Sequence, residues 1–356
     1  MSYNLFNSNY TCRNIIIMRK AIKTGIIGGS GYTGEELIRL ISAHSEAELQ
    51  AISSRDHFGK EIKQIYPNIK NLPNICFCKP EFNSFLDCDV IFFATPHGFS
   101  MNLVKKFLAE NIKIIDLSAD FRIKDSEVWE KWYGVPHADV ESLKESVYGL
   151  VEDKKLEISS AKLVAVPGCY PTATLLGILP LLNARKKIID ITCDAKSGLT
   201  GAGRLAVETS LSSEMEENFK AYGVEMHRHT PEIEQFIKTK LSYPIGFNFV
   251  PHLVPMMRGI YATLYLSMEN SNEDWINLYN DFYLDFNDVS VLEGELVPES
   301  LSVSNTNKCQ ISIKKSSIKN QLVIISSIDN LMKGASGQAI QCFNLMNDFD
   351  IDHALP

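Results

Sequence analysis

The sequence predicts an α/β domain with a parallel sheet, followed by an α+β domain with a mixed sheet. Three observations predict this arrangement. Between residues 21 and 168, short apolar runs alternate with helical segments, which is typical of parallel strands joined by right-handed crossovers. After residue 169 the apolar runs are longer, and two follow each other across a short turn, as in an antiparallel pair. A length of 356 residues also suits two domains.

The first domain is predicted from five apolar runs and two helical segments. The run "DVIFFAT" (89–95) is almost entirely apolar, which suits a strand that is covered on both faces. A helix is expected at 35–43, where Leu37, Ile38 and Ile41 share one face, and another at 102–111. Strands are expected at 21–28, 48–53, 89–95, 112–117 and 162–166.

The second domain is expected to begin with a helix over 172–179, with Pro171 in the first turn, where proline is tolerated. The turn 314–320 joins two strands into an antiparallel pair. A last helix at 333–346 has apolar residues at helical spacing and is expected to pack back on the first domain. The other elements expected here are strands at 188–195, 258–268, 310–313 and 322–328 and a helix at 274–286.

The composition is that of an ordinary globular protein, with 45% hydrophobic and 22% charged residues. A net charge of −8 argues against nucleic acid as a partner. No apolar run reaches the roughly 18 residues of a membrane-spanning helix, and the isoleucines at 15–17 are too few for a signal peptide. The eight cysteines contain no CxxC pair, which favours a reducing compartment. We therefore expect a cytoplasmic protein without membrane or nucleic-acid partners.

The segment "GIIGGSGYTGEEL" (25–37) ends the first predicted strand and opens the first predicted helix. Gly29, Gly31 and Gly34 match the G-x-G-x-x-G fingerprint, and Gly28 offers an overlapping register. Such glycines allow a tight turn and bring the amides of a helix N-terminus close to a diphosphate. The sequence therefore predicts a Rossmann-type dinucleotide site, with contacts from Gly28, Ser30, Gly31, Tyr32, Thr33 and Gly34.

The end of the second predicted strand indicates which dinucleotide binds. An NAD site places an acidic residue about 20 residues beyond the glycines, whereas this chain has Ser54 and Arg55 at that place. Hydroxyl and guanidinium groups suit a 2′-phosphate, so NADP is favoured, although Asp56 follows directly. The alternative is that Arg55 is a solvated surface charge.

The stretch "VPGCYPTA" (166–173) places Cys169 at a predicted strand-to-helix turn. A helix N-terminus and a nearby imidazolium both lower the pKa of a thiol below its ordinary value of about 8.5. This position predicts a lowered pKa and a reactive thiol at Cys169, and the alternative is a buried structural thiol. Most of the other cysteines are expected to be small buried hydrophobic residues.

The segment "MHRHTPEIEQ" (226–235) contains two histidines, His227 and His229. In an extended segment they would share a face, and Thr230 would then cap the helix that follows. A histidine ahead of a helix in a cleft is a candidate general acid or base. The alternatives are packed structural histidines or half of a metal site with His252; no zinc-ligand spacing supports a metal.

Several polar side chains follow predicted strands or lie in glycine-rich loops. Ser118 and Arg122 come from "DLSADFR" (116–122), Arg204 ends "KSGLTGAGR" (196–204), and Arg258 follows "PMM". Arginine binds carboxylates and phosphates through paired hydrogen bonds. Together with the thiol and the nucleotide loop, this set indicates an anionic substrate.

These motifs give the chain a resemblance to the N-acetyl-gamma-glutamyl-phosphate reductase family, which has a fold like that of aspartate-semialdehyde dehydrogenase. The resemblance covers nearly everything after residue 22 and is most specific from 164 to 180. Only the extension 1–20 lies outside the pattern. The motifs are "GIIGGSGYTGEEL", "SSR", "ATPHG" (94–98), "DLSADFR", "WYGVPH", "VAVPGCYPTATLLGILP", "SGLTGAGR", "HRHTPEIEQ", "VPHLVPMMRGI" and "DNLMKGASGQAIQ".

The resemblance implies a reduction of an acyl phosphate to an aldehyde by NADPH, with release of phosphate, in arginine biosynthesis. It implies an NADP-binding Rossmann domain at 21–168, a catalytic and oligomerisation domain at 169–330 and a C-terminal helix at 331–356 that returns to the first. The assembly would be a homodimer or homotetramer. Cys169 matches the nucleophile and His227 the acid/base. Substrate contacts would be His229, Arg122, Ser197 and Tyr222, and further coenzyme contacts Pro96, Asn330 and Gly334.

Two sibling activities and one non-enzymatic function remain as alternatives. Aspartate-semialdehyde dehydrogenases typically carry asparagine before the cysteine, where this chain has Gly168. An N-blocked aminoadipyl phosphate differs by one methylene, which a binding site distinguishes only modestly. A non-catalytic NADP-binding regulator would not need both Cys169 and His227.

Overall fold

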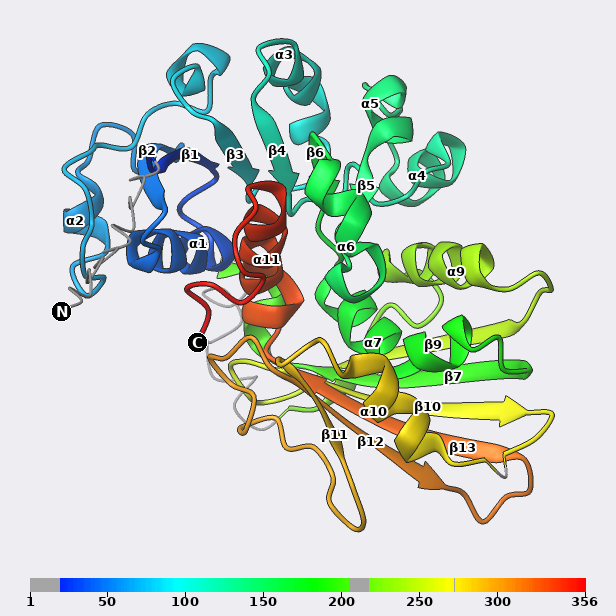
Figure 1. The fold of residues 1–356 in the computed structure, drawn as a ribbon. Helices are drawn as coiled ribbons and strands as arrows, with labels where there is room; N and C mark the ends of the chain where they lie inside the picture. The colour runs from blue at the N-terminus through cyan, green and yellow to red at the C-terminus, as the bar shows by residue number, and fades with distance from the viewer. Residues whose placement is uncertain (1–19, 205–217, 272) are drawn as a thin grey trace, which may run out of the picture.

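The computed structural model describes residues 20–204, 218–271 and 273–356 (Figure 1). The predicted extension 1–20 therefore lies almost wholly outside the described residues. Within them the chain forms two sheets, which Figure 1 shows as separate layers joined by α7 and α11. No helix in the described part is long and apolar enough to cross a membrane.

The first sheet is parallel, and its described strands follow the order β2-β1-β3-β4-β6-β5. The strands are β1 (Ile22–Ile27), β2 (Ala47–Ser53), β3 (Val90–Phe93), β4 (Lys113–Asp116), β5 (Val147–Tyr148) and β6 (Leu163–Ala165). Every residue of β3 is buried, as expected for a strand between two layers of helices. The chain goes from β1 to β2 on one side and then to β3 on the other. This reversal creates the crevice in which open α/β sheets bind ligands.

The first-sheet connections are mostly helical. They comprise α1 (Tyr32–Ala43), α2 (Ile62–Ile65), η1 (Phe82–Phe85), η2 (Ser100–Asn102), α3 (Val104–Ala109), α4 (Ser126–Tyr133), α5 (Val140–Glu145) and α6 (Val151–Ser160). The helix predicted over 102–111 is present but shorter, as α3. A 3-10 turn precedes a shorter α3 because the Asp120 carboxylate accepts the amides of Gly98 and Met101 and turns the chain there.

The second sheet is mixed, with described strands in the order β11-β12-β13-β10-β7-β9-β8. Its strands are β7 (Ile188–Ser197), β8 (Lys220–Ala221), β9 (Gly246–Leu253), β10 (Ile260–Met268), β11 (Val289–Leu292), β12 (Cys309–Lys315) and β13 (Gln321–Ile328). The predicted antiparallel pair is present as β12 and β13. The pairs β7–β9 and β11–β12 are parallel, so the predicted mixed sheet is confirmed.

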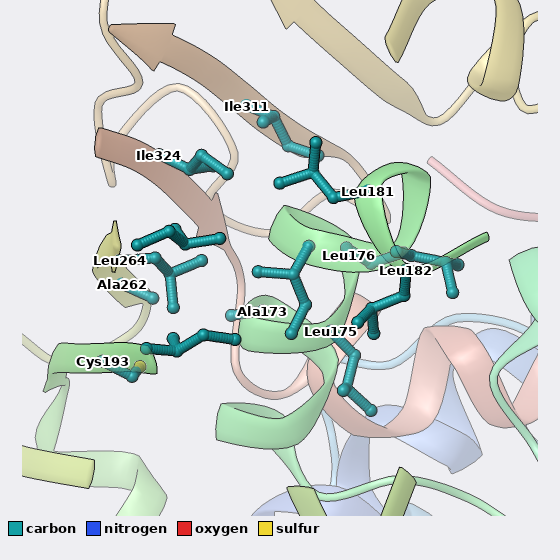
Figure 2. Close-up of a cluster of buried hydrophobic side chains, with 14 of the residues drawn as sticks. Ala173, Leu175, Leu176, Leu181, Leu182, Cys193, Ala262, Leu264, Ile311 and Ile324 are labelled. Atoms are coloured by element: carbon teal, nitrogen blue, oxygen red, sulfur yellow. The ribbon is translucent and has the colours of Figure 1, made fainter. Parts of the chain in front are cut away.

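Helix α7 (Cys169–Asn183) forms the core of the second domain and is apolar around almost its whole circumference. Its Leu176 and Leu181 face Leu264 of β10 and Ile324 of β13, all fully buried (Figure 2). A helix that is apolar on all sides requires neighbours on all sides. Helices α9 (His229–Lys240) and α10 (Trp275–Tyr283) provide part of that cover.

The helix that carries Cys169 begins three residues earlier than the sequence predicts. The Gly168 carbonyl accepts both the amide and the hydroxyl of Thr172, at 2.9 and 3.0 Å. Gly168 is therefore the N-cap and Cys169 the first helical residue. Pro171 still falls in the first turn, where its missing N–H has no effect on the helix.

The C-terminal segment returns to the first sheet. The π-helical turn η4 (Met332–Ser336) leads into α11 (Gly337–Met346), which contacts α6, α1 and β4 (Figure 1). Ile340 and Phe343 of α11 belong to the same buried cluster as Phe92 of β3. The segment thus covers the sheet while its first turn lies against Cys169 of the second domain.

Candidate active site

A cleft of about 860 Å³ lies where the carboxyl edge of the first sheet meets the start of α7, the turn after β7 and η4. It brings together residues from segments far apart in the sequence. Predicted site residues that do not line it are Gly34, Ser197, Tyr222 and His227. Predicted site residues that line it are Gly28, Ser30, Gly31, Tyr32, Thr33, Ser54, Arg55, Pro96, Arg122, Cys169, His229, Asn330 and Gly334.

The glycine loop between β1 and α1 is closely packed beneath and open above. A Cβ on Gly28, whose φ is +98°, would lie 2.4 Å from the Ala94 carbonyl oxygen, and one on Gly34 would lie 2.4 Å from the Gly28 oxygen. Gly31, in contrast, has open space around it and is the N-cap of α1 without a side-chain cap. The first amides of α1 therefore remain available to an anion in the cleft. Gly34 serves helix–loop packing.

The predicted 2′-phosphate residues lie at the end of β2. Ser54 is buried, and its hydroxyl accepts the His57 amide at 3.2 Å. Arg55 is exposed, with its guanidinium 5.6 Å from the centre of the Phe99 ring. Among the described residues no carboxylate forms an ion pair with Arg55. Its N–H groups are therefore available to a ligand.

The Cys169 thiol lies in the cleft at the N-terminus of α7. Burial raises its pKa to about 11, while the Tyr170 amide and the Arg122 charge act in the lowering direction. The expected low pKa of this thiol is therefore not found, because desolvation outweighs the helix terminus. A thiol in this state must lose its proton to a base as it attacks.

The two histidines lie at different depths beside this thiol. The His229 ring lines the cleft and contacts the Gly168 backbone so closely that a Cβ there would be 2.4 Å from Nε2. His227 lies behind it, with 4.9 Å between the two ring centres. The Nδ1 of His227 accepts the His229 amide at 3.2 Å. The segment is not extended, and Thr230 is the second residue of α9 rather than its cap.

Both imidazoles are neutral at pH 7. Burial, with a contribution from Arg228, lowers the pKa of His227 to about 4. Burial and the neighbouring His227 and Arg122 lower the pKa of His229 well below its ordinary value. The imidazolium that was expected near Cys169 is therefore not found. A neutral imidazole beside a protonated thiol is instead suited to accept a proton.

Glu232 is a site residue that the sequence motifs did not identify. Its buried carboxylate accepts the Gly168 amide at 2.9 Å and the Tyr148 hydroxyl at 2.7 Å, and lies 3.5 Å from Arg122. It thus connects the turn before Cys169 to the guanidinium that lines the cleft. Its position three residues after His229, on the same helix face, was an available signal.

The remaining predicted substrate residues lie around the cleft. The buried Ser197 hydroxyl donates to the Gly198 carbonyl at 3.0 Å. The Tyr222 hydroxyl donates to that of Tyr170 at 3.2 Å, behind Cys169. A Cβ on Gly334 would lie 2.8 Å from the Cys169 Cβ, so only glycine allows η4 to approach this closely.

The Asn330 side chain lines the cleft and links two loops. It donates to the Thr200 hydroxyl at 3.0 Å and accepts the Gly259 amide at 2.7 Å. Both loops belong to the second domain, so Asn330 fixes the part of the cleft wall that this domain provides.

The predicted set of anion-binding side chains is only partly brought together. Arg122 lines the cleft close to Cys169, whereas Arg258 is paired with Glu36 and Asp329. Arg204 lines the cleft but is paired with Glu35. Ser118 is buried and bonded to Asp116.

The Nδ1 of His252, the candidate metal ligand, lies 3.1 Å from an Asp194 carboxylate oxygen. Among the described residues no group of three or more histidine, cysteine or acidic side chains could hold a metal ion.

Comparison with known proteins decides the family. The model "Semialdehyde dehydrogenase, NAD binding domain" matches residues 23–161, and "Semialdehyde dehydrogenase, dimerisation domain" matches 169–330. The N-acetyl-gamma-glutamyl-phosphate reductase of Nitrosospira multiformis is 47% identical over 91% of this chain and 95% of its own length. The chain belongs to the N-acetyl-gamma-glutamyl-phosphate reductase family. The enzyme of that name from Pseudomonas fluorescens is 45% identical over 94% of this chain and 97% of its own.

Solved structures agree on the fold of this family member. Aspartate semialdehyde dehydrogenase II of Vibrio cholerae superposes with a TM-score of 0.72 at 14% identity, over 93% of this chain and 99% of its own. The Candida albicans aspartate semialdehyde dehydrogenase, solved with NADP, gives 0.67 at 16%, over 92% and 99%. The family and fold predicted from sequence are both confirmed.

Proposed function

We propose that this protein reduces N-acetyl-gamma-glutamyl phosphate to N-acetylglutamate semialdehyde with NADPH, releasing phosphate, as a cytoplasmic step of arginine biosynthesis. The observation that carries the proposal is the position of Cys169. Its thiol shares one cleft with an open helix N-terminus on the coenzyme side and with the neutral His229 ring on the other. The relatives named for this reaction match the chain over more than 90% of its length.

The residues of the cleft fit a dinucleotide. Gly28 to Thr33 would hold the diphosphate at the N-terminus of α1, because Gly31 leaves that end open. Ser54 and Arg55 would bind the 2′-phosphate, which favours NADPH over NADH. Pro96, Asn330 and Gly334 would border the nicotinamide beside Cys169. Bound NADPH supplies the hydride.

We assign the proton transfers to His229, which contacts the turn before Cys169, rather than to His227 as the sequence indicated. As the thiol attacks the acyl carbon, its proton passes to the neutral His229, and the C–O bond to phosphate breaks to leave a thioester. After hydride addition, His229 returns the proton to the carbonyl oxygen, giving a thiohemiacetal. This collapses to the aldehyde, and its hydroxyl proton restores the thiol. Arg122, held by Glu232, is positioned for the anionic groups of the substrate.

We also propose a role for each part of the chain. Residues 21–168 bind coenzyme, 169–330 carry the catalytic groups and a subunit interface, and 331–356 return η4 and α11 to the first sheet. A homodimer or homotetramer is the expected assembly, in keeping with the dimerisation-domain match. Size-exclusion chromatography with light scattering distinguishes the two.

The contact between His229 and Gly168 argues against aspartyl phosphate as the substrate. An asparagine before the cysteine, as in the aspartate enzymes, would require the space that the His229 ring occupies. An N-blocked aminoadipyl phosphate remains the second candidate, because it adds only one methylene.

The test is the reverse reaction with purified protein, phosphate and NADP⁺, followed by absorbance of the reduced coenzyme. N-acetylglutamate semialdehyde should be oxidised faster than its aminoadipate homologue, and NADP⁺ should be used better than NAD⁺. Cys169→Ser should fold and bind coenzyme but lose turnover. Preference for the longer aldehyde would reassign the substrate, and an active Cys169→Ser protein would refute the thioester route.

A further inference from the structure

We infer that Phe99 is a specificity-determining residue that positions Arg55 for the 2′-phosphate of NADP. The inference rests on the coenzyme preference proposed above and extends it to a residue that binds no phosphate itself. The two side chains come from different connections. Arg55 follows β2 and Phe99 precedes η2 after β3, and both line the cleft. Because β1 lies between β2 and β3, the contact spans the carboxyl end of β1, where the glycine loop begins.

The backbone on both sides of Phe99 is fixed by a buried carboxylate. Asp120 is fully buried and accepts the Gly98 amide at 2.6 Å, the Met101 amide at 3.2 Å and the Ser100 hydroxyl at 3.0 Å. The Phe99 ring is partly buried against the apolar cluster under the loop. The ring is therefore a rigid surface, set by one side chain that holds the whole turn.

Arg55 has no comparable support of its own. Its side chain is exposed, and its guanidinium lies 5.6 Å from the Phe99 ring centre. No carboxylate among the described residues holds it, so Phe99 is the contact that restricts this long and flexible side chain. Stacking on an aromatic ring leaves the N–H groups at the guanidinium edge free for paired bonds to a phosphate.

This arrangement makes affinity for NADP, but not for NAD, depend on Phe99. A flexible arginine must lose rotamer freedom when it binds a phosphate, and the ring restricts that freedom in advance. A cation–π contact at such an exposed site corresponds to about a two- to fivefold change in affinity. NAD has no 2′-phosphate for Arg55 to bind, so the affinity for NAD should not depend on the Phe99 ring.

Binding of NADP⁺ and NAD⁺ should be measured by titration calorimetry without substrate, in Phe99→Leu, Phe99→Tyr and Arg55→Ala proteins. Phe99→Leu should weaken the binding of NADP⁺ by about two- to fivefold and leave the affinity for NAD⁺ within a factor of about two. Phe99→Tyr, which keeps the ring, should match the parent protein. In Arg55→Ala protein, adding Phe99→Leu should weaken NADP⁺ no further, because the partner is already absent.

Equal losses for both coenzymes in Phe99→Leu would mean a general loop effect and would overturn the inference. The inference would also be overturned if Phe99→Leu weakened NADP⁺ binding in Arg55→Ala protein by the same factor as in the parent protein. If Arg55→Ala does not discriminate NADP⁺ from NAD⁺, the proposed coenzyme preference fails and the role of Phe99 falls with it. If only Phe99→Leu fails to discriminate, the preference stands and Phe99 has no part in it.

Discussion

At the scale of single residues, the contact between His229 and Gly168 ties the proposed acid/base group to the turn that carries the thiol. A Cβ on Gly168 would lie 2.4 Å from the His229 Nε2 and 2.8 Å from two ring carbons. The Gly168 backbone, with φ −66° and ψ 158°, is one that alanine adopts readily. Substitution there should therefore displace the ring without straining the chain.

Gly168→Ala is accordingly expected to lower kcat by about 100-fold, since a displacement near 1 Å at a catalytic group has effects of this size. Its melting temperature should change little. Steady-state kinetics and thermal unfolding together check this. Near-normal kcat would mean that the His229 ring moves aside without consequence, and that its place beside Gly168 is incidental.

The assignment of proton transfer to His229 predicts a difference between two matched variants. His229→Asn should lower kcat by about 10²- to 10⁴-fold while NADP⁺ binding is retained. His227→Asn, at a ring that does not line the cleft, should have a smaller effect, through the lost hydrogen bond to the His229 amide. If His227→Asn is the more damaging change, the roles are reversed.

The pH profile provides a second check on His229. Its pKa is lowered well below the ordinary value by burial. The imidazole therefore stays in the basic, neutral form as pH falls through 6.5, and kcat/KM should not decline there on its account. A decline with an apparent pKa near 6.5 would show that the base titrates as an ordinary, solvated histidine.

Sequence patterns predicted which residues line the cleft better than they predicted the protonation and the contacts of those residues. Cys169, the glycine loop and Arg55 were predicted from motif and spacing, because those signals are local, and all three line one cleft. Glu232 and the raised pKa of Cys169 depend on which groups exclude water from the cleft. That information lies in contacts between β6, α7 and α9, which no local window contains.

At the scale of elements, the strands that were predicted match the structure more closely than the turns that follow them, whereas β9 and β11 were not predicted. The run 112–117 was identified by its apolar residues and appears as β4 (Lys113–Asp116). The next turn depends on Asp116 and Asp120, whose carboxylates bond to Ser100, Ser118 and backbone amides from two connections. This long-range network determines where α3 begins. Because it is not visible in the local sequence, the helix predicted over 102–111 was too long.

The Asp116 carboxyl should make stability depend on pH. Burial and the neighbouring Asp120 raise its pKa to about 7, from an ordinary value of 3.8. Between these values the unfolded chain loses the proton that the folded protein keeps, so the free energy of unfolding falls as pH rises, by at most about 1.4 kcal/mol per pH unit. Asp116→Asn should flatten this part of the profile. Urea unfolding from pH 4 to 8 tests it, and parallel profiles for parent and variant would contradict it.

At the scale of the whole molecule, two ionic networks hold the segments that meet at Cys169. Arg258 joins Glu36 of α1 to Asp329 after β13. Lys333 of η4 joins Glu152 of α6 to Asp288 before β11. Each network links the first sheet to the second, so together they fix where η4 lies between the two. The sequence could not predict them, since their members are charged residues without a shared motif or spacing.

Lys333 is the member whose removal should matter most. It is fully buried, lies 2.5 Å from the Glu152 carboxylate, contacts Asp288 and donates to the Gln341 side chain at 2.8 Å. Lys333→Met would leave two acidic groups in the interior without their cation. Breaking a buried pair in this way costs about 3–5 kcal/mol, whereas Lys308→Met at an exposed position should stay within about 0.5 kcal/mol.

The position of Lys333 gives this change a second consequence. Gly334, the next residue, contacts the Cys169 Cβ, so a shift of η4 should also alter the catalytic turn. Lys333→Arg, which keeps the charge, should recover more stability and more activity than Lys333→Met. Unfolding and kcat should therefore be measured on all three variants, with Lys308→Met as the control. If Lys333→Met is as stable as that control, the network of Lys333, Glu152 and Asp288 does not hold the two sheets together. Apolar packing of α7 and α11 alone would then account for the arrangement.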